Sequence, residues 1–199
     1  LKKEIDGSQI AQYNYDAANR LASVIAPDNT IITNSYDADG RRVKQIVGSQ
    51  AIMYLWDETS LYGNVVLETT EGVNASYTLA GTQLISQTRD GSTSYYLQDG
   101  QGSTRTLTNN AGAITDIYSY TAYGEIYSQT GTTENNYLYT GQLYDQSTGL
   151  YSLRARFYNP SWGRFLSQDT WAVNYSNPIE LNRYGYAANR PTTLSDPSG

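Results

Sequence analysis

The chain has 199 residues, no cysteine, no histidine and a formal net charge of −6. The two missing residue types exclude disulfides, zinc–thiolate sites, cysteine nucleophiles and histidine acid–base catalysis, and no cofactor or metal is expected. Twenty tyrosines with only 16% charged residues favour a half-buried β-sheet over a long helical protein or a disordered chain. No apolar run approaches the length that spans a membrane.

An aromatic residue recurs about every twenty positions along the chain. The spacings are 21, 20, 21, 19, 22, 21 and 19 residues, between Tyr15, Tyr36, Trp56, Tyr77, Tyr96, Tyr118, Tyr139 and Tyr158. A fixed period of this size indicates a repeat protein, in which each unit buries its apolar face against its neighbours. We expect a ladder of packed tyrosine rings along a sheet. The alternative is an exposed aromatic row that binds sugars or another surface.

The first units predict paired strands joined by tight turns. A strand is expected to end at Tyr15-Asp16, at Tyr36-Asp37 and at Trp56-Asp57. The aspartate can accept hydrogen bonds from backbone N–H groups two residues on, and Asn19 or Gly40 then supplies the left-handed residue of the hairpin loop. Further strands are predicted over residues 21–25, 30–35 and 43–47, with a return turn at 27–29.

Later units keep the same rhythm with other turn residues. Asp90-Gly91 and residues 109–112 are hairpin turn signals, and residues 64–67 and 117–120 alternate as strands do. We expect no helix before residue 160.

Charge is distributed unevenly along the chain. Residues 1–136 hold eight basic and fifteen acidic side chains, whereas residues 137–199 hold five arginines and four acidic side chains. Nucleic-acid binding needs a basic footprint, so the acidic body argues against it.

The repeat units resemble the YD repeats of the Rhs family, which includes bacterial Rhs polymorphic toxins, the C components of Tc toxins and the teneurin shell. The resemblance becomes specific after residue 94, in residues 95–104 and 118–125. From residue 139 onward the chain is similar to the Rhs-associated core domain, in the ordered blocks 139–145, 148–151, 154–160, 163–169, 182–186, 189–191 and 196–199.

The resemblance implies a fold and a division of the chain. Members of the family coil their repeats into a spiral β-sheet that closes a hollow shell, and the core domain curls inward at one end. We therefore expect an all-β chain with a YD-repeat spiral over 1–136 and an Rhs core domain over 137–199. In many members the core domain ends in a self-cleavage site that releases a variable C-terminal segment.

Two aspartates carry that cleavage in family members, and they match Asp169 and Asp196 here. The resemblance implies a shared-proton pair, one acid and one base around a water, with scission expected near Gly199. The plainer interpretation is that Asp196 caps a turn and that Asp169 pairs with Arg164.

Three arginines stand close to these blocks, at Arg154, Arg156 and Arg164, and the first two are expected to share a strand face. They either form a buried network that orients the aspartates or stack on neighbouring tyrosine rings.

The leading hypothesis is a structural shell fragment with a core plug, with at most a single self-cleavage turnover that frees a C-terminal toxin or effector. The alternatives are a self-assembling extracellular filament and an adhesive or carbohydrate-binding surface protein. Expected partners are the rest of its own shell, a C-terminal effector segment, copies of itself, or glycans. All of these hypotheses place the protein outside the cell or on its surface.

Overall fold

The computed structural model describes residues 2–5, 9–59 and 62–199, with side chains from residue 11 onward. Two compact units divide the chain, one of residues 1–93 with 146–148 and the other of residues 94–145 with 149–199. Among the described residues the helical segments are three short 3-10 turns, and the other regular elements are β-strands. The all-β prediction is therefore confirmed. The sequence division at residue 136 stays a prediction.

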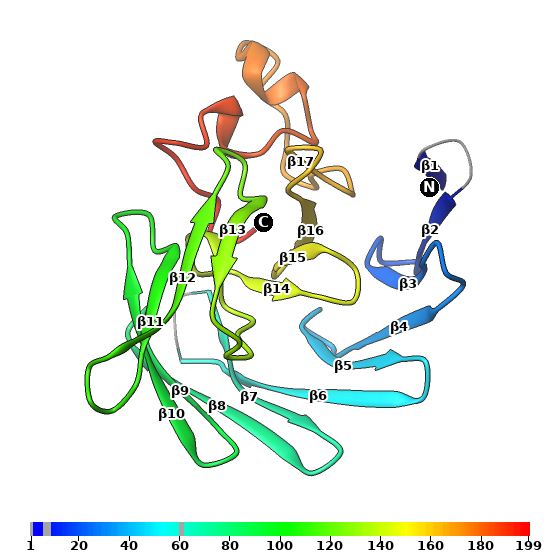
Figure 1. Ribbon diagram of the computed structural model, residues 1–199. Helices are drawn as coiled ribbons and strands as arrows, with labels where there is room; N and C mark the ends of the chain where they lie inside the picture. The colour runs from blue at the N-terminus through cyan, green and yellow to red at the C-terminus, as the bar shows by residue number, and fades with distance from the viewer. Residues whose placement is uncertain (1, 6–8, 60–61) are drawn as a thin grey trace. The chain divides into compact units, whose positions relative to one another are not determined.

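The first unit is an antiparallel meander in which each described strand pairs with the next along the chain (Figure 1). A meander needs only short connections, and the predicted turns supply them. Its strands are β1 (Lys2–Ile5), β2 (Gln9–Tyr15), β3 (Leu21–Ile25), β4 (Ile31–Tyr36), β5 (Arg42–Val47), β6 (Gln50–Asp57), β7 (Asn64–Thr70), β8 (Val73–Ala80) and β9 (Gln83–Arg89).

The second unit holds two sheets. One is a meander of β10 (Ser92–Gln98), β11 (Thr104–Thr108), β12 (Ile114–Tyr120) and β13 (Ile126–Thr130). The other is formed by β14 (Leu143–Asp145), β15 (Leu150–Leu153), β16 (Arg156–Asn159) and β17 (Arg164–Phe165). The 3-10 turns η1 (Tyr139–Gly141), η2 (Pro178–Leu181) and η3 (Ala187–Asn189) complete this unit.

The YD turns form as the sequence predicts. Asp16 accepts hydrogen bonds from the backbone N–H groups of Ala18 and Arg20, each at 2.9 Å. Asn19 and Gly40 have φ angles of 61° and 84°, the left-handed conformation that the hairpin loop requires. The pKa of Asp16 lies below its ordinary value, mainly because the backbone N–H of Arg20 donates a hydrogen bond to the charged carboxylate.

Neighbouring repeats are joined by the polar group of the repeated aromatic side chain. Tyr36 donates a hydrogen bond from its hydroxyl to the carbonyl of Leu21 at 2.8 Å. Trp56 donates from its indole N–H to the carbonyl of Arg42 at 3.0 Å. Leu21 and Arg42 are both six residues after the YD aromatic residue of their own repeat, so the same link recurs from one unit to the next. The guanidinium of Arg20 also lies over the Tyr36 ring, 4.9 Å from its centroid.

Aromatic rings form the core of the second unit. Tyr118, Tyr151, Tyr158 and Tyr186 are each 1% exposed. Ring centroids lie 6.4 Å apart for Tyr151 and Tyr158, and 4.4 Å apart for Tyr158 and Tyr186. These tilted contacts contribute stability beyond the area that the rings bury. Tyrosine rings therefore pack together in this unit, but Tyr151 and Tyr186 are not members of the twenty-residue series, and the ladder of successive periodic rings stays a prediction.

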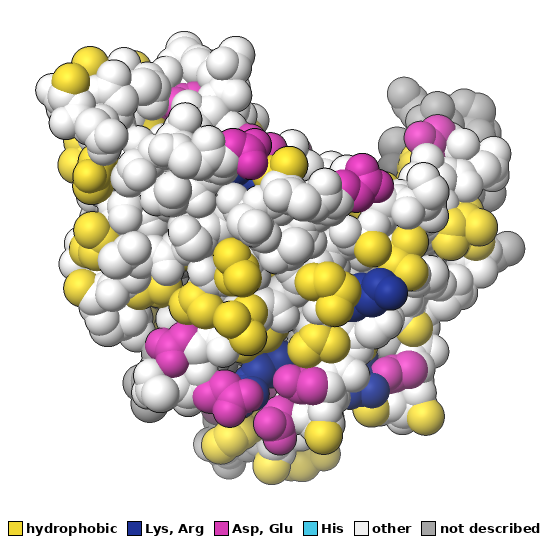
Figure 2. Space-filling view, turned by 90° about the horizontal axis from the view of Figure 1, so that it is seen from below, with side chains coloured by type: hydrophobic (Ala, Val, Ile, Leu, Met, Phe, Trp, Pro, Cys, Tyr) yellow, Lys and Arg dark blue, Asp and Glu magenta, His cyan; other side chains and the backbone are white. Residues whose placement is uncertain are grey.

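The molecular surface carries few basic groups. On the face shown in Figure 2, the basic side chains in the lower part of the view adjoin acidic ones, and apolar side chains are exposed among them. Among the described ion pairs, Arg41 is bonded to Glu58 at 2.6 Å and Arg20 to Asp16 at 2.8 Å. This face presents no continuous basic surface.

We predict that Gly124→Ala destabilises the second unit more than Gly112→Ala does. Both glycines have positive φ, 89° and 76°, so both variants carry the same kind of backbone strain. A Cβ at Gly124 would lie 2.5 Å from the Tyr139 ring, whereas a Cβ at Gly112 meets nothing within 4 Å. Overpacking of this kind costs about 1–3 kcal/mol. Urea unfolding of the two variants measures the difference, and equal losses would contradict the packing at Tyr139.

We also predict that stability falls at alkaline pH. Burial raises the pKa of Tyr118 to about 12, from an ordinary value of 10.0. The contribution of this group to stability is complete below pH 10 and is lost as the pH rises toward 12, because the unfolded chain ionises first. Unfolding free energies at about pH 8 and about pH 11 should differ by about 1 kcal/mol through Tyr118. The Tyr118→Phe variant should show a smaller difference, and an equal one would refute the assignment.

Candidate functional site

The two aspartates that the sequence singles out lie in the second unit, in loops outside its strands. Asp169 comes four residues after β17, and its backbone N–H donates to the Arg183 carbonyl at 3.0 Å. Its Oδ1 accepts from the backbone N–H of Trp171 at 2.8 Å. Asp196 lies near the end of the chain, where its Oδ1 accepts from the backbone N–H of Gly199 at 2.8 Å. Each carboxylate thus has one oxygen held by its own loop.

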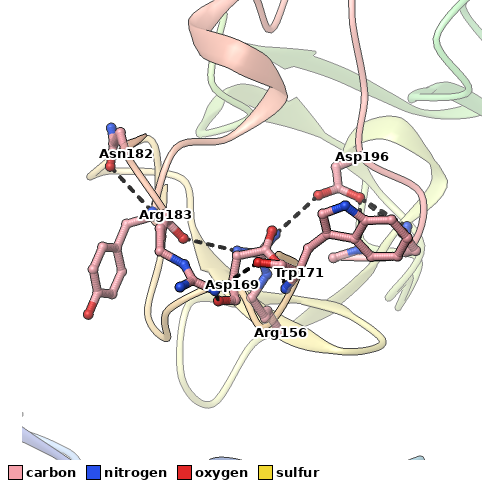
Figure 3. A network of polar contacts seen from close by, with 9 residues as sticks. Arg156, Asp169, Trp171, Asn182, Arg183 and Asp196 are labelled. Carbon is pink, nitrogen blue, oxygen red and sulfur yellow. Dashed lines mark hydrogen bonds and ion pairs between the residues drawn. The ribbon is translucent and has the colours of Figure 1, made fainter. Parts of the chain in front are cut away.

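The remaining oxygens of both aspartates face one guanidinium, that of Arg156 at the start of β16 (Figure 3). The Nη2 of Arg156 lies 2.9 Å from Asp169 Oδ2 and 3.5 Å from Asp196 Oδ2. Arg156 is 8% exposed, whereas the side chains of Asp169 and Asp196 are 39% and 24% exposed. Burial lowers the pKa of Arg156, and the charges of the two aspartates oppose that shift. The centre of the site is therefore a buried cation that is paired with two carboxylates, both more exposed to solvent than the cation.

Phe165 and Arg183 fix the position of this guanidinium. The Arg156 guanidinium carbon lies 3.7 Å from the centroid of the Phe165 ring, which packs beneath it. Its Nη1 donates to the Arg183 carbonyl at 3.2 Å. Since the Asp169 N–H donates to that same carbonyl, one backbone oxygen aligns both members of the ion pair.

Arg183 also holds the loop from the other side. Its Nη2 donates to the carbonyls of Asp169 and Trp171, the latter at 2.9 Å. Asp169 is therefore anchored through its N–H, its carbonyl and both carboxylate oxygens, as Figure 3 shows for part of this network. Such anchoring holds a side chain in one geometry, as a reactive site requires.

The terminal segment lies against the turn between β15 and β16. The Ala155 N–H donates to the Ser198 carbonyl at 3.1 Å, and the Arg154 guanidinium donates to the Pro197 carbonyl. At Gly199 the φ angle is 85°, and a Cβ there would lie 2.1 Å from the Leu153 carbonyl oxygen. Only glycine fits so close to the backbone of the turn. These contacts keep residues 196–199 beside Arg156.

A cavity of about 280 Å³ opens next to Asp169. The segment that follows Asp169 and the 3-10 turns η2 and η3 form its walls. Its lining is part apolar and part polar, from Asp169, Trp171, Ala172, Val173, Ile179, Glu180, Asn182, Arg183, Gly185, Ala188 and Asn189. The cavity gives the Asp169 carboxylate a route to solvent.

The structure separates the three arginines that the sequence groups together. Arg156 contacts both aspartates, as in the predicted network, but the ring beneath it is Phe165 rather than a tyrosine. Arg154 has a φ of 61° in the turn before β16, so it does not share a strand face with Arg156 as expected. Arg164 lies over Tyr184 at 5.3 Å, and Asp169 pairs with Arg156 rather than with Arg164. The expected turn at Asp196 does form, in addition to its ion pair.

Sequence reasoning missed Arg183 and Phe165. Both lie in blocks that were recognised, 182–186 and 163–169, but no local pattern indicates that an arginine will bind carbonyls twelve and fourteen residues before it. The described residues contain no group of three or more His, Cys, Asp or Glu side chains arranged to hold a metal ion. No helix in the described part of the chain has the length and apolar character needed to cross a bilayer.

The chain is similar to sections of much longer proteins. The chain is 33% identical over 195 residues to the tRNA3(Ser)-specific nuclease WapA of Bacillus spizizenii, a match that covers 94% of this chain and 8% of that protein. It is 26% identical over 231 residues to the double-stranded DNA deaminase toxin A of Burkholderia cenocepacia, covering 99% of this chain and 16% of that one. The chain thus spans a small part of each relative.

The fold is also found in a solved toxin complex. The crystal structure of TcdB2-TccC3 matches with a TM-score of 0.76 and 21% identity, over 96% of this chain and 10% of that one. The Teneurin YD-shell family model matches residues 67–192, well over half of the sequence. Together with the repeated YD turns and the consecutive antiparallel strands, this match places the chain in the Rhs/YD-repeat family, within the group described as the Teneurin YD-shell.

Proposed function

We propose that the chain is a section of a YD-repeat shell wall that ends in an aspartyl self-cleavage centre. The centre consists of Asp169 and Asp196, and its product is a free C-terminal effector segment. The single observation that carries the proposal is the ion pairing of one buried guanidinium with both carboxylates, beside the terminal residues 196–199. Residue 137 is the proposed start of the core domain, and the protein acts outside the cell or at its surface.

The proposed chemistry requires that the two carboxyl groups flank the peptide bond that is cut. One carboxylate takes a proton from a water molecule, which attacks the carbonyl carbon of the bond. The other carboxyl group, protonated, gives its proton to the departing nitrogen, so the products are a carboxylic acid and an amine. The cavity that Asp169 lines supports a role of this residue as the group that binds the water molecule.

Arg156 serves this reaction as a positioning residue. It holds both carboxylates at one point, and its buried charge opposes the repulsion that they would otherwise exert on each other. The contacts of Ser198 and Gly199 with Ala155 and Asp196 set the terminal segment in the same place. A peptide bond that is already held beside the reacting carboxyl groups is cut faster, because no further orientation of the reactants is required.

A carbohydrate-binding surface protein is the second candidate. The observation that favours it is a groove of about 510 Å³ in the second unit, whose lining combines aromatic rings with polar side chains. Among these are Tyr123, Trp162, Glu125 and Arg164. Rings that stack on a sugar face and polar groups that bind its hydroxyls are the elements of a saccharide site. The groove lies outside the Asp169–Arg156–Asp196 network.

The test of self-cleavage uses a polypeptide that continues beyond Gly199 into a reporter domain. We expect the unmodified polypeptide to yield two fragments, and Asp169→Asn and Asp196→Asn to slow this at least about 100-fold, the scale of a lost acid or base. Asp99→Asn is the matched control, because Asp99 accepts backbone N–H groups in the same kind of turn, from Gln101 and Ser103, outside the site. Intact-mass spectrometry over time measures the fragments. Cleavage of the Asp196→Asn polypeptide at the unmodified rate would overturn the proposal.

A second prediction concerns Arg156. We expect Arg156→Met to destabilise the chain by about 1–3 kcal/mol, below the loss for a fully buried pair, because both aspartates are partly exposed. The double variant Arg156→Met/Asp169→Asn should lose less free energy of unfolding than the two single variants lose together. The reason is that the double variant no longer carries the Asp169 charge that Arg156→Met leaves without its partner. Urea unfolding of the three variants measures this coupling. Additive losses would show that Arg156 and Asp169 do not interact energetically.

A further inference from the structure

The segment that carries Asp196 is held from two sides. After Asp196, the carbonyl oxygens of residues 197 and 198 accept hydrogen bonds from the turn between β15 and β16. Before Asp196, the side-chain amide of Gln101 donates to the Pro191 carbonyl at 3.0 Å and reaches the Leu194 carbonyl at 3.5 Å. Gln101 lies in the turn between β10 and β11, ninety residues before Pro191. Asp196 therefore stands between one anchor on the sheet of β14–β17 and another on the meander of β10–β13.

Asp169 is held in a different way. Its partners among the described residues are Arg156, Trp171 and Arg183, which all lie between positions 156 and 183. The turn between β10 and β11 supplies none of these contacts. The two carboxylates of the site are thus positioned by different parts of the unit, and only the segment of Asp196 is bonded to this turn.

The turn between β10 and β11 is a firm support for Gln101. The Oδ1 of Asp99 accepts from the backbone N–H groups of Gln101 at 3.0 Å and Ser103 at 2.9 Å. The Ser103 hydroxyl in turn accepts from the backbone N–H of Thr140 at 3.0 Å, which fixes the turn to η1. A side chain on a backbone held in this way is suited to position another group. Asp99→Asn keeps the accepting oxygen, so the turn stays formed in that variant.

A tyrosine near the same carbonyl cannot replace the Gln101 contact. The Tyr139 hydroxyl lies 2.8 Å from the Ala122 carbonyl oxygen and 3.2 Å from that of Pro191. A hydroxyl has one proton to donate, and the nearer carbonyl is the better acceptor. The Gln101 amide has two protons, so it is the donor on which the position of the Pro191 carbonyl depends.

We propose that Gln101 is a positioning residue for Asp196, through which the turn between β10 and β11 completes the cleavage centre. The inference rests on the proposed self-cleavage and names what controls it. Loss of the Gln101 amide leaves the segment of Asp196 anchored on one side only, whereas Asp169 keeps all of its partners. The centre is then active only in a chain whose β10–β11 turn is formed and docked on residues 191–194.

The test exchanges the amide for a group whose ability to donate depends on pH. In Gln101→Glu the ionised carboxylate has no proton for the two carbonyls, whereas the protonated carboxyl group can donate again. In the polypeptide that continues beyond Gly199, we expect this variant to be cut at least about tenfold more slowly than the unmodified form at about pH 7. At about pH 4, near the ordinary pKa of glutamate, its rate should approach the unmodified rate. Gln101→Ala should be slow at both pH values. Intact-mass spectrometry measures each rate relative to the unmodified polypeptide at the same pH.

Gln98→Glu is the matched control. The Gln98 amide donates to the Gly102 carbonyl at 2.8 Å, inside the same turn, and it bonds to none of the described residues 191–194. Its rate relative to the unmodified polypeptide should be the same at both pH values. The inference is overturned if Gln98→Glu and Gln101→Glu behave alike, or if Gln101→Glu is cut at the unmodified rate at about pH 7.

Hydrogen exchange separates this inference from the proposed function. The backbone N–H groups of Leu194 and Gly199 are bonded to Arg190 and Asp196, so their exchange reports whether the terminal segment is held. Gln101→Ala should raise their exchange rates at least about tenfold, and Gln98→Ala should not. An unmodified polypeptide that is never cut overturns the proposed function alone. Unchanged exchange in Gln101→Ala overturns the role of Gln101, whether or not the polypeptide is cut.

Discussion

A hairpin of twenty residues buries too little apolar surface to be stable alone, and the first unit is organised around that constraint. From β2 to β8 each strand belongs to two ladders, so a hairpin shares backbone hydrogen bonds with its neighbours as well as between its own strands. The aromatic residue of one repeat then donates a hydrogen bond to the carbonyl six residues after the aromatic residue of the previous repeat, as Tyr36 does to Leu21 and Trp56 to Arg42. Later members of the series bond side chains instead: Tyr77 donates to the Glu68 carboxylate and Tyr96 to the Asn135 side-chain oxygen.

The candidate site is organised by a different constraint, the cost of burying a charge. A guanidinium as enclosed as that of Arg156 requires partners, and it takes two carboxylates, a backbone carbonyl and an aromatic ring. These partners come from three separate segments of the sequence, at residues 165–169, Arg183 and Asp196. One buried cation therefore brings together the β16 strand, the loop after β17, the segment around Arg183 and the terminal residues.

The difference between these constraints explains what the sequence could predict. The YD turn is local, because Asp16 accepts hydrogen bonds from N–H groups two and four residues away. The residues of the turn are therefore enough to predict it. Asp169 and Asp196 were found through a family resemblance, and the structure joins them through Arg156. The partner of Asp169 could not be chosen from three nearby arginines, since that choice depends on where β15 ends. Arg154 falls in the turn and Arg156 enters the next strand, a shift of two residues that the pattern does not reveal.

The order in which the strands pair has a consequence for biosynthesis. Since every described strand of the first unit pairs with its immediate successor, the wall can assemble hairpin by hairpin while the ribosome is still extending the chain. The contact between Arg156 and Asp196 joins residues that are forty positions apart in the chain. Any reaction at that centre is therefore delayed until translation has passed Asp196, by which time the repeats have already been made.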